Sequence, residues 1–180
     1  MRITDCRYDR DRRRLAVAYR LIGHEARTQT IRLATGLSGD RVRKLYREYV
    51  KGQQIRPVRR RRGKSPRQMA FFQRNPILEL QAATLGAMLQ RCGLLAHPTG
   101  PRGPVLDDVE RFCDVYETFC VACPRTAITF EHAWYLLQVL ARLDEFVLTR
   151  CRDCEALWIR DTLDLLPDNC AACRGDPPGE

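Results

Sequence analysis

Four cysteines near the C-terminus have the spacing of a metal site. Cys151 and Cys154 form one C-x2-C pair, Cys170 and Cys173 form another, and fifteen residues separate the two pairs. Such a pair lets a tight turn aim two thiolates at one ion, and the intervening segment is long enough for a short hairpin that brings the turns together. Zinc suits four soft thiolates, and a closed tetrahedral site leaves no open position for catalysis. We therefore predict a structural zinc ion; the alternatives are four unpaired cysteines or two redox pairs.

One detail departs from the usual pattern. Zinc-binding turns often carry glycine directly after the second cysteine, whereas this chain has Glu155 and Arg174 at those positions.

A third C-x2-C pair, formed by Cys120 and Cys123, has a different context. The preceding periodicity places Cys113 and Cys120 on the inward face of a helix, where cysteine packs as a small hydrophobic residue, and Cys123 stands just before a proline at the helix end. A redox motif is expected at the start of a helix that follows a strand. We interpret these three cysteines and Cys92 as structural, with a thiol redox enzyme as the alternative.

Catalytic groups are scarce elsewhere. The chain has three histidines, His24, His97 and His132, and none stands beside a serine or cysteine in a nucleophile motif. No glycine-rich phosphate loop occurs either. The sequence therefore predicts a protein that is not an enzyme.

Charge is divided unevenly along the chain. Residues 1–75 have a net charge of +16 and residues 76–180 a net charge of −7. A strongly basic half favours a polyanionic partner, and nucleic acid is the commonest one. The acidic half is where we expect a protein partner.

Two short helices in the basic half have the dimensions of a helix-turn-helix. We predict helices over residues 28–35 and 39–50, separated by a turn in which Gly36 ends the first and Ser38 caps the second. Such a motif places its second helix in the major groove of DNA. Apolar residues of the pattern face inward, and the outer face of the second helix is basic, with candidate DNA contacts at Arg41, Arg43, Lys44 and Arg47. An ordinary helical hairpin with a solvated basic face is the alternative.

Residues 51–68 read as an exposed basic linker, because they combine glycine and proline with almost no apolar residue. Their cations are candidate phosphate contacts or a minor-groove arm: Arg56, Arg59, Arg60, Arg61, Arg62, Lys64 and Arg67. A disordered solubilising loop is the alternative.

The remaining pattern is helical. We predict further helices over residues 10–24, 76–91, 105–121 and 130–148, the second of these beginning with Asn75 as N-cap and a proline in its first turn. The predicted fold is mainly α: a basic helical region (1–50), the linker (51–68), a helical core and partner region (69–148) and a zinc-ribbon-like module (149–175). No secretory signal or membrane span is recognisable, so a cytoplasmic location without membrane contact is expected.

The order of these parts resembles the FlhC family, whose members are subunits of the bacterial master activator of flagellar genes. The resemblance covers most of the chain, from about residue 15 to residue 173. Besides the doubled C-x2-C, it is carried by residues 33–49 (LATGLSGDRVRKLYREY), residues 63–72 (GKSPRQMAFF), Ala133 and Trp134. Departures from the family pattern are the missing glycines, the run of four arginines and a short tail.

The resemblance implies a specific function. Members of the family are mostly helical, hold zinc through four C-terminal cysteines, and assemble with an FlhD-like subunit into a complex that binds double-stranded promoter DNA and recruits RNA polymerase. The expected function is therefore a DNA-binding transcriptional activator of flagellar genes. The alternative is an RNA-binding or scaffolding zinc protein without sequence-specific DNA recognition.

Overall fold

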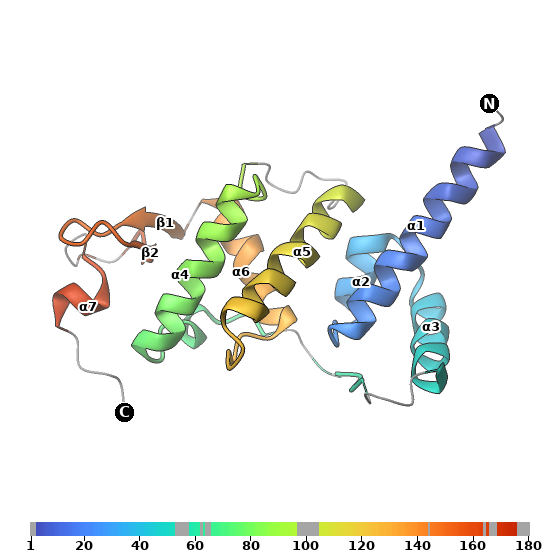
Figure 1. Cartoon of the computed structure of the whole chain (residues 1–180), viewed down its shortest axis with the longest axis horizontal. Helices are drawn as coiled ribbons and strands as arrows, with labels where there is room; N and C mark the ends of the chain where they lie inside the picture. Colours follow the sequence, from blue (N-terminus) through green and yellow to red (C-terminus); the bar gives the residue numbers. More distant parts are fainter. Residues whose placement is uncertain are drawn as a thin grey trace. The chain divides into compact units, whose positions relative to one another are not determined.

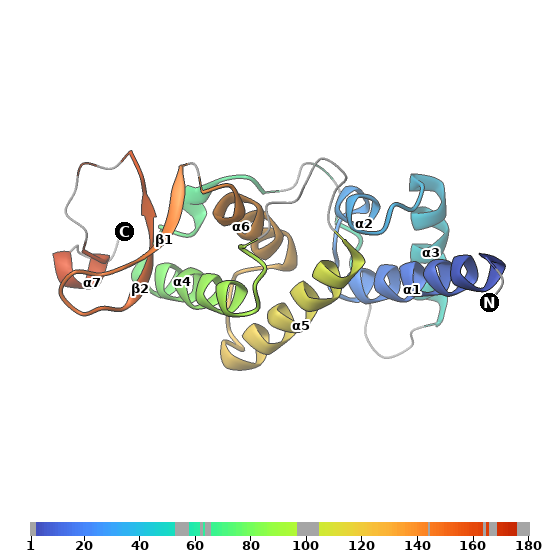
Figure 2. The same cartoon turned by 90° about the horizontal axis from the view of Figure 1, so that it is seen from above.

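A computed structural model describes residues 3–52, 58–61, 63, 66–96, 105–143, 145–163, 165 and 169–175, and the fold is mainly helical with a small two-stranded sheet (Figures 1 and 2). In chain order the elements are α1 (Ile3–Gly23), α2 (Thr28–Thr35), α3 (Gly39–Gly52), the 3-10 turn η1 (Met69–Phe71), α4 (Pro76–Arg91), α5 (Leu106–Ala122), α6 (Phe130–Arg142), β1 (Phe146–Arg150), β2 (Leu157–Asp161) and α7 (Ala171–Arg174).

The chain divides into two compact units. The N-terminal unit comprises residues 1–65 and 100–113, and the C-terminal unit comprises residues 66–99 and 114–180. Helix α5 contributes its first residues to the former and its remainder to the latter. Within the described residues, none of the helices has the length and apolar character needed to cross a membrane.

The N-terminal unit is built on the mutual packing of α1, α2 and α3. Gly36 ends α2 in the left-handed conformation (φ 70°), and the Ser38 hydroxyl accepts from the Arg41 amide at 3.3 Å, so the predicted end cap and start cap are both confirmed. Ile31 and Val42 are fully buried, as expected. On α1, Leu21 and Ile22 are fully buried.

The C-terminal unit has α4 and α6 side by side (Figures 1 and 2). Helix α4 begins where the sequence indicated, because the Asn75 side chain accepts from the Leu78 amide at 2.9 Å and a proline follows it. Thr129 caps α6, accepting from the His132 amide while its own amide donates to His132 Nδ1 at 3.3 Å. Gly86 lets α4 approach its neighbours, since a Cβ there would lie 3.2 Å from side-chain carbons of Leu140 and Leu148.

The predicted helix over residues 130–148 is wrong in its last part. Leu143 adopts the left-handed conformation (φ 56°) and ends α6, and Phe146–Arg150 then forms β1. Strand β1 pairs antiparallel with β2, with Leu148 opposite Ile159. The resulting hairpin packs on α4, where Trp158 and Ile159 are buried. The expected module boundary at residue 149 therefore falls inside a strand, and the hairpin belongs to the core of the C-terminal unit.

The segment before α4, which carries part of the family resemblance, packs onto α6. Met69 and Phe72 are buried, and the Phe71 ring stacks on the His132 ring with centroids 3.9 Å apart. The guanidinium carbon of Arg74 also lies over the Phe71 ring, 5.3 Å from its centroid. This stack gives His132 a structural position in the helix cap.

Candidate metal centre and nucleic-acid interface

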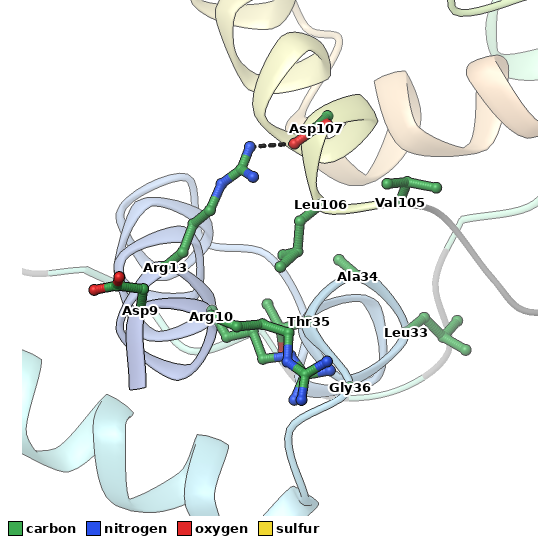
Figure 3. Close-up of a pocket in the computed structure, with 11 residues that line it drawn as sticks. Asp9, Arg10, Arg13, Leu33, Ala34, Thr35, Gly36, Val105, Leu106 and Asp107 are labelled. Atoms are coloured by element: carbon green, nitrogen blue, oxygen red, sulfur yellow. Dashed lines mark hydrogen bonds and ion pairs between the residues drawn. The ribbon is translucent and has the colours of Figure 1, made fainter. Parts of the chain in front are cut away.

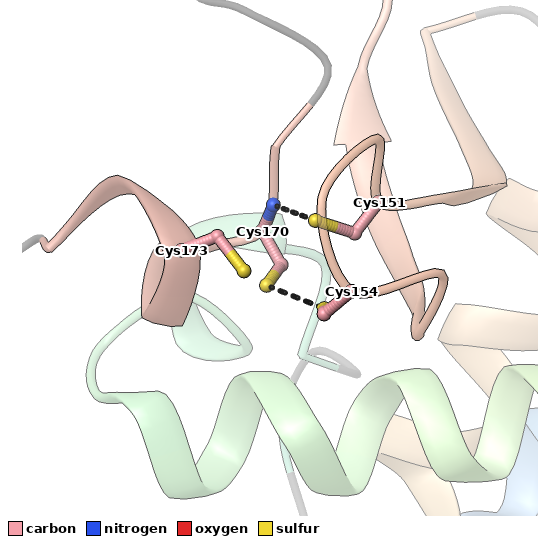
Figure 4. A group of neighbouring side chains, drawn as sticks. All are labelled: Cys151, Cys154, Cys170 and Cys173. Atoms are coloured by element: carbon pink, nitrogen blue, oxygen red, sulfur yellow. Dashed lines mark hydrogen bonds between the residues drawn. The ribbon is translucent and has the colours of Figure 1, made fainter.

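The first cysteine pair lies in the turn of the β1–β2 hairpin. The Cys151 amide donates to the Ala156 carbonyl at 2.8 Å, and the Glu155 amide donates to the Cys151 carbonyl at 3.0 Å. These bonds fold the turn back on itself, so Cys151 and Cys154 face the same side (Figure 4). Glu155 has φ 59°, the left-handed conformation that glycine adopts most easily. Glutamate at this position therefore adds local strain to the turn.

The second pair lies at the start of α7. The Cys173 amide donates to the Cys170 carbonyl at 3.0 Å, which closes a turn around this pair. Arg174 donates to the Asn169 carbonyl at 3.1 Å and its guanidinium lies 5.4 Å from the Trp158 ring centroid, which ties α7 to β2. The left-handed residue here is Gly175 (φ 71°), one position later than the usual pattern.

The four sulfur atoms converge on one point (Figure 4). All lie within 4.8 Å of one another, and Cys154 Sγ is 3.7 Å from Cys170 Sγ. A tetrahedral ion with sulfur ligands at about 2.3 Å requires sulfur separations of about 3.8 Å, so little movement is needed. In the described part of the spacer, β2 pairs with β1, the strand that leads into the first cysteine pair. The four cysteines can hold a metal ion.

Hydrogen bonding and burial shift the pKa values of Cys151, Cys170 and Cys173 in different directions. The backbone amide of Cys154, followed by that of Cys170, lowers the pKa of the Cys151 thiol to about 6. Burial raises the pKa of Cys170, and hydrogen bonds with the side chains of Cys154 and Cys170 raise that of Cys173. Cys151 therefore loses its proton more readily than Cys170 or Cys173, and a thiolate is the form that binds a cation.

Two polar residues flanking the cysteines link the pairs, and sequence reasoning missed them. The Asn169 amide group donates to the Asp153 carboxylate, joining the turn of the first pair to the residue before the second. Their positions beside cysteines were the available signal, because residues next to metal ligands commonly orient them.

Of the other predicted structural cysteines, Cys113 and Cys120 lie on α5, and Cys92 and Cys123 directly follow α4 and α5. Cys113 is buried, Cys120 and Cys123 are half-buried, and Cys92 is exposed. Burial raises the pKa of Cys120, which disfavours the thiolate that redox chemistry requires. Among the described residues, only the C-terminal four form a cysteine cluster suited to a metal.

The basic face of α3 is exposed as predicted, but its cations differ in their partners. Arg43 pairs with Asp40, and this hydrogen bond lowers the pKa of that carboxyl group. Lys44 lies 3.9 Å from Glu48. Within the described residues, Arg41 and Arg47 are exposed and have neither an ion pair nor a side-chain hydrogen bond. These two are the cations of α3 most available to an external anion.

The described linker residues are exposed or half-buried, in line with the predicted exposed linker, but some of them also contact the N-terminal unit. Glu25, in the left-handed conformation (φ 58°), accepts from the Arg59 amide at 3.2 Å and pairs with Arg61 at 2.9 Å. Arg60 lies over Tyr46 with its guanidinium carbon 5.7 Å from the ring centroid. Arg61 is therefore partly neutralised, whereas the Arg59 side chain is exposed. Nothing in the sequence around Glu25 indicates this contact.

Four candidate contacts remain. Arg67 is exposed and belongs to the C-terminal unit. Arg56, Arg62 and Lys64 lie outside the described residues. The structure thus brings the basic residues of α3 together on one helix face, and brings Arg59, Arg60 and Arg61 to Glu25 and Tyr46 of the same unit.

No protein-family model matches the chain, and a search of curated proteins finds no significant match either. Function must therefore be argued from the residues and their arrangement.

Proposed function

We propose that the protein is a DNA-binding transcriptional activator of flagellar genes that acts together with an FlhD-like subunit. The observation that carries the proposal is the face of α3, where Arg41 and Arg47 are exposed and have no ion-pair partner among the residues that the structure describes. A guanidinium with free donors can bind a phosphate or the O6 and N7 atoms of guanine. This face sits on the second of two short helices joined by a capped turn, as in a helix-turn-helix reader.

The docked linker extends this basic surface within the same unit. Arg59 offers an exposed guanidinium, and the bonds to Glu25 hold its backbone against the N-terminal unit. A held arm loses less entropy on binding than a free one. We assign these arginines to phosphate contacts that add affinity without reading sequence.

The four-cysteine centre has a structural role in this proposal, with zinc as its ion. Zinc bound by four thiolates has no open coordination position, so it would hold the β1–β2 hairpin to α7 without performing chemistry. The acidic C-terminal half and the family resemblance support an FlhD-like subunit and RNA polymerase as partners, in the cytoplasm.

DNA binding is the direct test. Fluorescence anisotropy would measure the affinity of the protein, alone and with its FlhD-like partner, for promoter duplex at several salt concentrations. Each lost phosphate contact lowers the slope of log affinity against log salt by about 0.9. We expect the double variant Arg41→Gln/Arg47→Gln to reduce the slope by about 1.8 if both residues bind phosphate. If they bind guanine instead, roughly 10- to 100-fold of sequence preference is lost.

Arg111→Gln is a matched control, because Arg111 pairs with Asp108 within α5, away from α3. This variant removes one positive charge and should leave the salt slope nearly unchanged. Salt-independent binding, or an equal effect of the control, contradicts the proposal. Effective competition by RNA of matched length would favour the RNA-binding alternative instead.

A further inference from the structure

A pocket of about 570 Å³ lies in the N-terminal unit, away from the basic face of α3 (Figure 3). Its walls come from α1, the C-terminal end of α2 and the start of α5. The volume falls in the range typical of sites for small organic ligands. None of the residues that line the pocket has a role in the proposed DNA contacts or in the metal centre.

The cations of this pocket are unequally neutralised. Arg13 is satisfied: its guanidinium binds the carboxylates of Glu110 and Asp107, and these hydrogen bonds raise its pKa further. Arg14 is only partly satisfied, because Nη1 lies 3.5 Å from Asp11 while its buried Nε has no hydrogen-bond partner among the described atoms.

Arg10 is the cation of the pocket most available to bind an anion. It has no recorded ion pair or hydrogen bond in the described part of the chain. Figure 3 shows its side chain directed toward Gly36 at the end of α2, whereas the Asp9 carboxylate points away. The end of a helix carries only about half a negative charge, so a full carboxylate would be a better partner for this guanidinium.

The opposite side of the pocket is apolar and accessible. Leu33 and Val105 line it with exposed fractions of 52% and 61%, and Leu106 contributes a further aliphatic side chain. Large aliphatic side chains exposed beside the unpaired guanidinium of Arg10 favour a ligand with an anionic head and an apolar body.

We propose that this pocket binds a small organic acid with an aliphatic body, the chemistry of a medium-chain carboxylate. The carboxylate bonds to the exposed guanidinium of Arg10, and the hydrocarbon chain covers Leu33 and Val105. Binding is independent of DNA, so failure of this proposal leaves the proposed function unaffected.

Octanoate is the probe, and isothermal titration calorimetry of the full chain measures its affinity and stoichiometry. We expect one site per chain. Arg10→Gln should weaken binding roughly 10- to 100-fold, the range for loss of a hydrogen-bonded charge partner. Leu33→Gln should also weaken it, and the neutral octanamide should bind at least about tenfold less tightly than octanoate.

Arg41→Gln serves as the matched control, because it removes the same charge from α3, outside the pocket. Circular dichroism melts verify that each variant folds, and Arg10 is chosen for the main test because Arg14 is partly buried. Equal binding by Arg10→Gln and the intact chain overturns the proposal. If octanamide binds as tightly as octanoate, the anionic head group is not recognised and the proposal is wrong. If inorganic phosphate binds as tightly as octanoate, the apolar side of the pocket contributes nothing and the proposal is wrong as well.

Discussion

Replacing single cysteines should show which ligands of the metal centre lose a proton when zinc binds. At pH 7, a thiol with a pKa of about 6 such as Cys151 is about nine-tenths thiolate. Cys170 and Cys173, whose pKa values are raised above the ordinary 9.0, are protonated there. A metal ion must displace these protons, so the affinity for zinc should increase with pH. Two protons make the logarithm of affinity rise by at least about two per pH unit between about pH 6.5 and 8.

The variants Cys173→Ser and Cys151→Ser should differ in this slope. Each removes one of four ligands and should lower zinc affinity roughly 100- to 1,000-fold, a quarter of the binding energy of a structural zinc site. Only Cys173→Ser also removes a proton that zinc must displace, so its slope should fall by about one. The slope of Cys151→Ser should stay nearly the same, because Cys151 is already ionised over most of this range.

Competition with a chelator of known affinity at four pH values measures these slopes, and calorimetry in buffers of different ionisation enthalpy counts the protons released. Cys92→Ser is the control, since Cys92 is exposed and lies outside the cluster. Equal slopes in the two ligand variants, or affinity that does not change with pH, would refute the assignment of the thiolate to Cys151. Thermal melts combined with the DNA-binding assay should show that Cys151→Ser destabilises the protein first and impairs DNA binding only as a consequence.

Three further substitutions test the fold around the centre, each by chemical unfolding. Glu155→Gly should stabilise the protein by up to about 1 kcal/mol, because glycine adopts the left-handed conformation without strain; a net loss would mean that the side chain makes a favourable contact. Asn75→Ala should cost about 1 kcal/mol through loss of the α4 cap, and Asn75→Asp should retain most of it, so equal losses would refute the capping role. Gly86→Ala should cost about 1–3 kcal/mol, because its Cβ would press on Leu140 and Leu148; an unchanged midpoint would show that these leucines can move aside.

The features that sequence alone could predict are those with strong local determinants. The limits of α2 and α4 agree with the prediction, because Gly36 and the Asn75 cap act within one helical turn. The cysteine cluster was predicted for a similar reason: pair spacing fixes a turn regardless of its surroundings.

The features that were missed depend on contacts distant in sequence. The apolar pattern of α6 continues through Phe146, and neither glycine nor proline marks the break at Leu143. The strand there is stabilised by pairing with β2 and by packing on α4, which a local pattern cannot report. The contact of the linker with Glu25 was missed for a similar reason, since Glu25 acts on Arg61 across thirty-six positions.

The docking of the hairpin on α4 has a consequence for the order of assembly. Trp158 and Ile159 anchor β2 in the interior, so the turn with Cys151 and Cys154 is held by the core of its unit. The four residues of α7 are too few to form a helix by themselves. We therefore expect an incoming ion to bind first to Cys151 and Cys154, which the folded core holds in place, and then to bind the second pair. Loops of about ten residues close within about 10–100 ns, so removal of thiol protons, and not chain motion, would set the rate of loading.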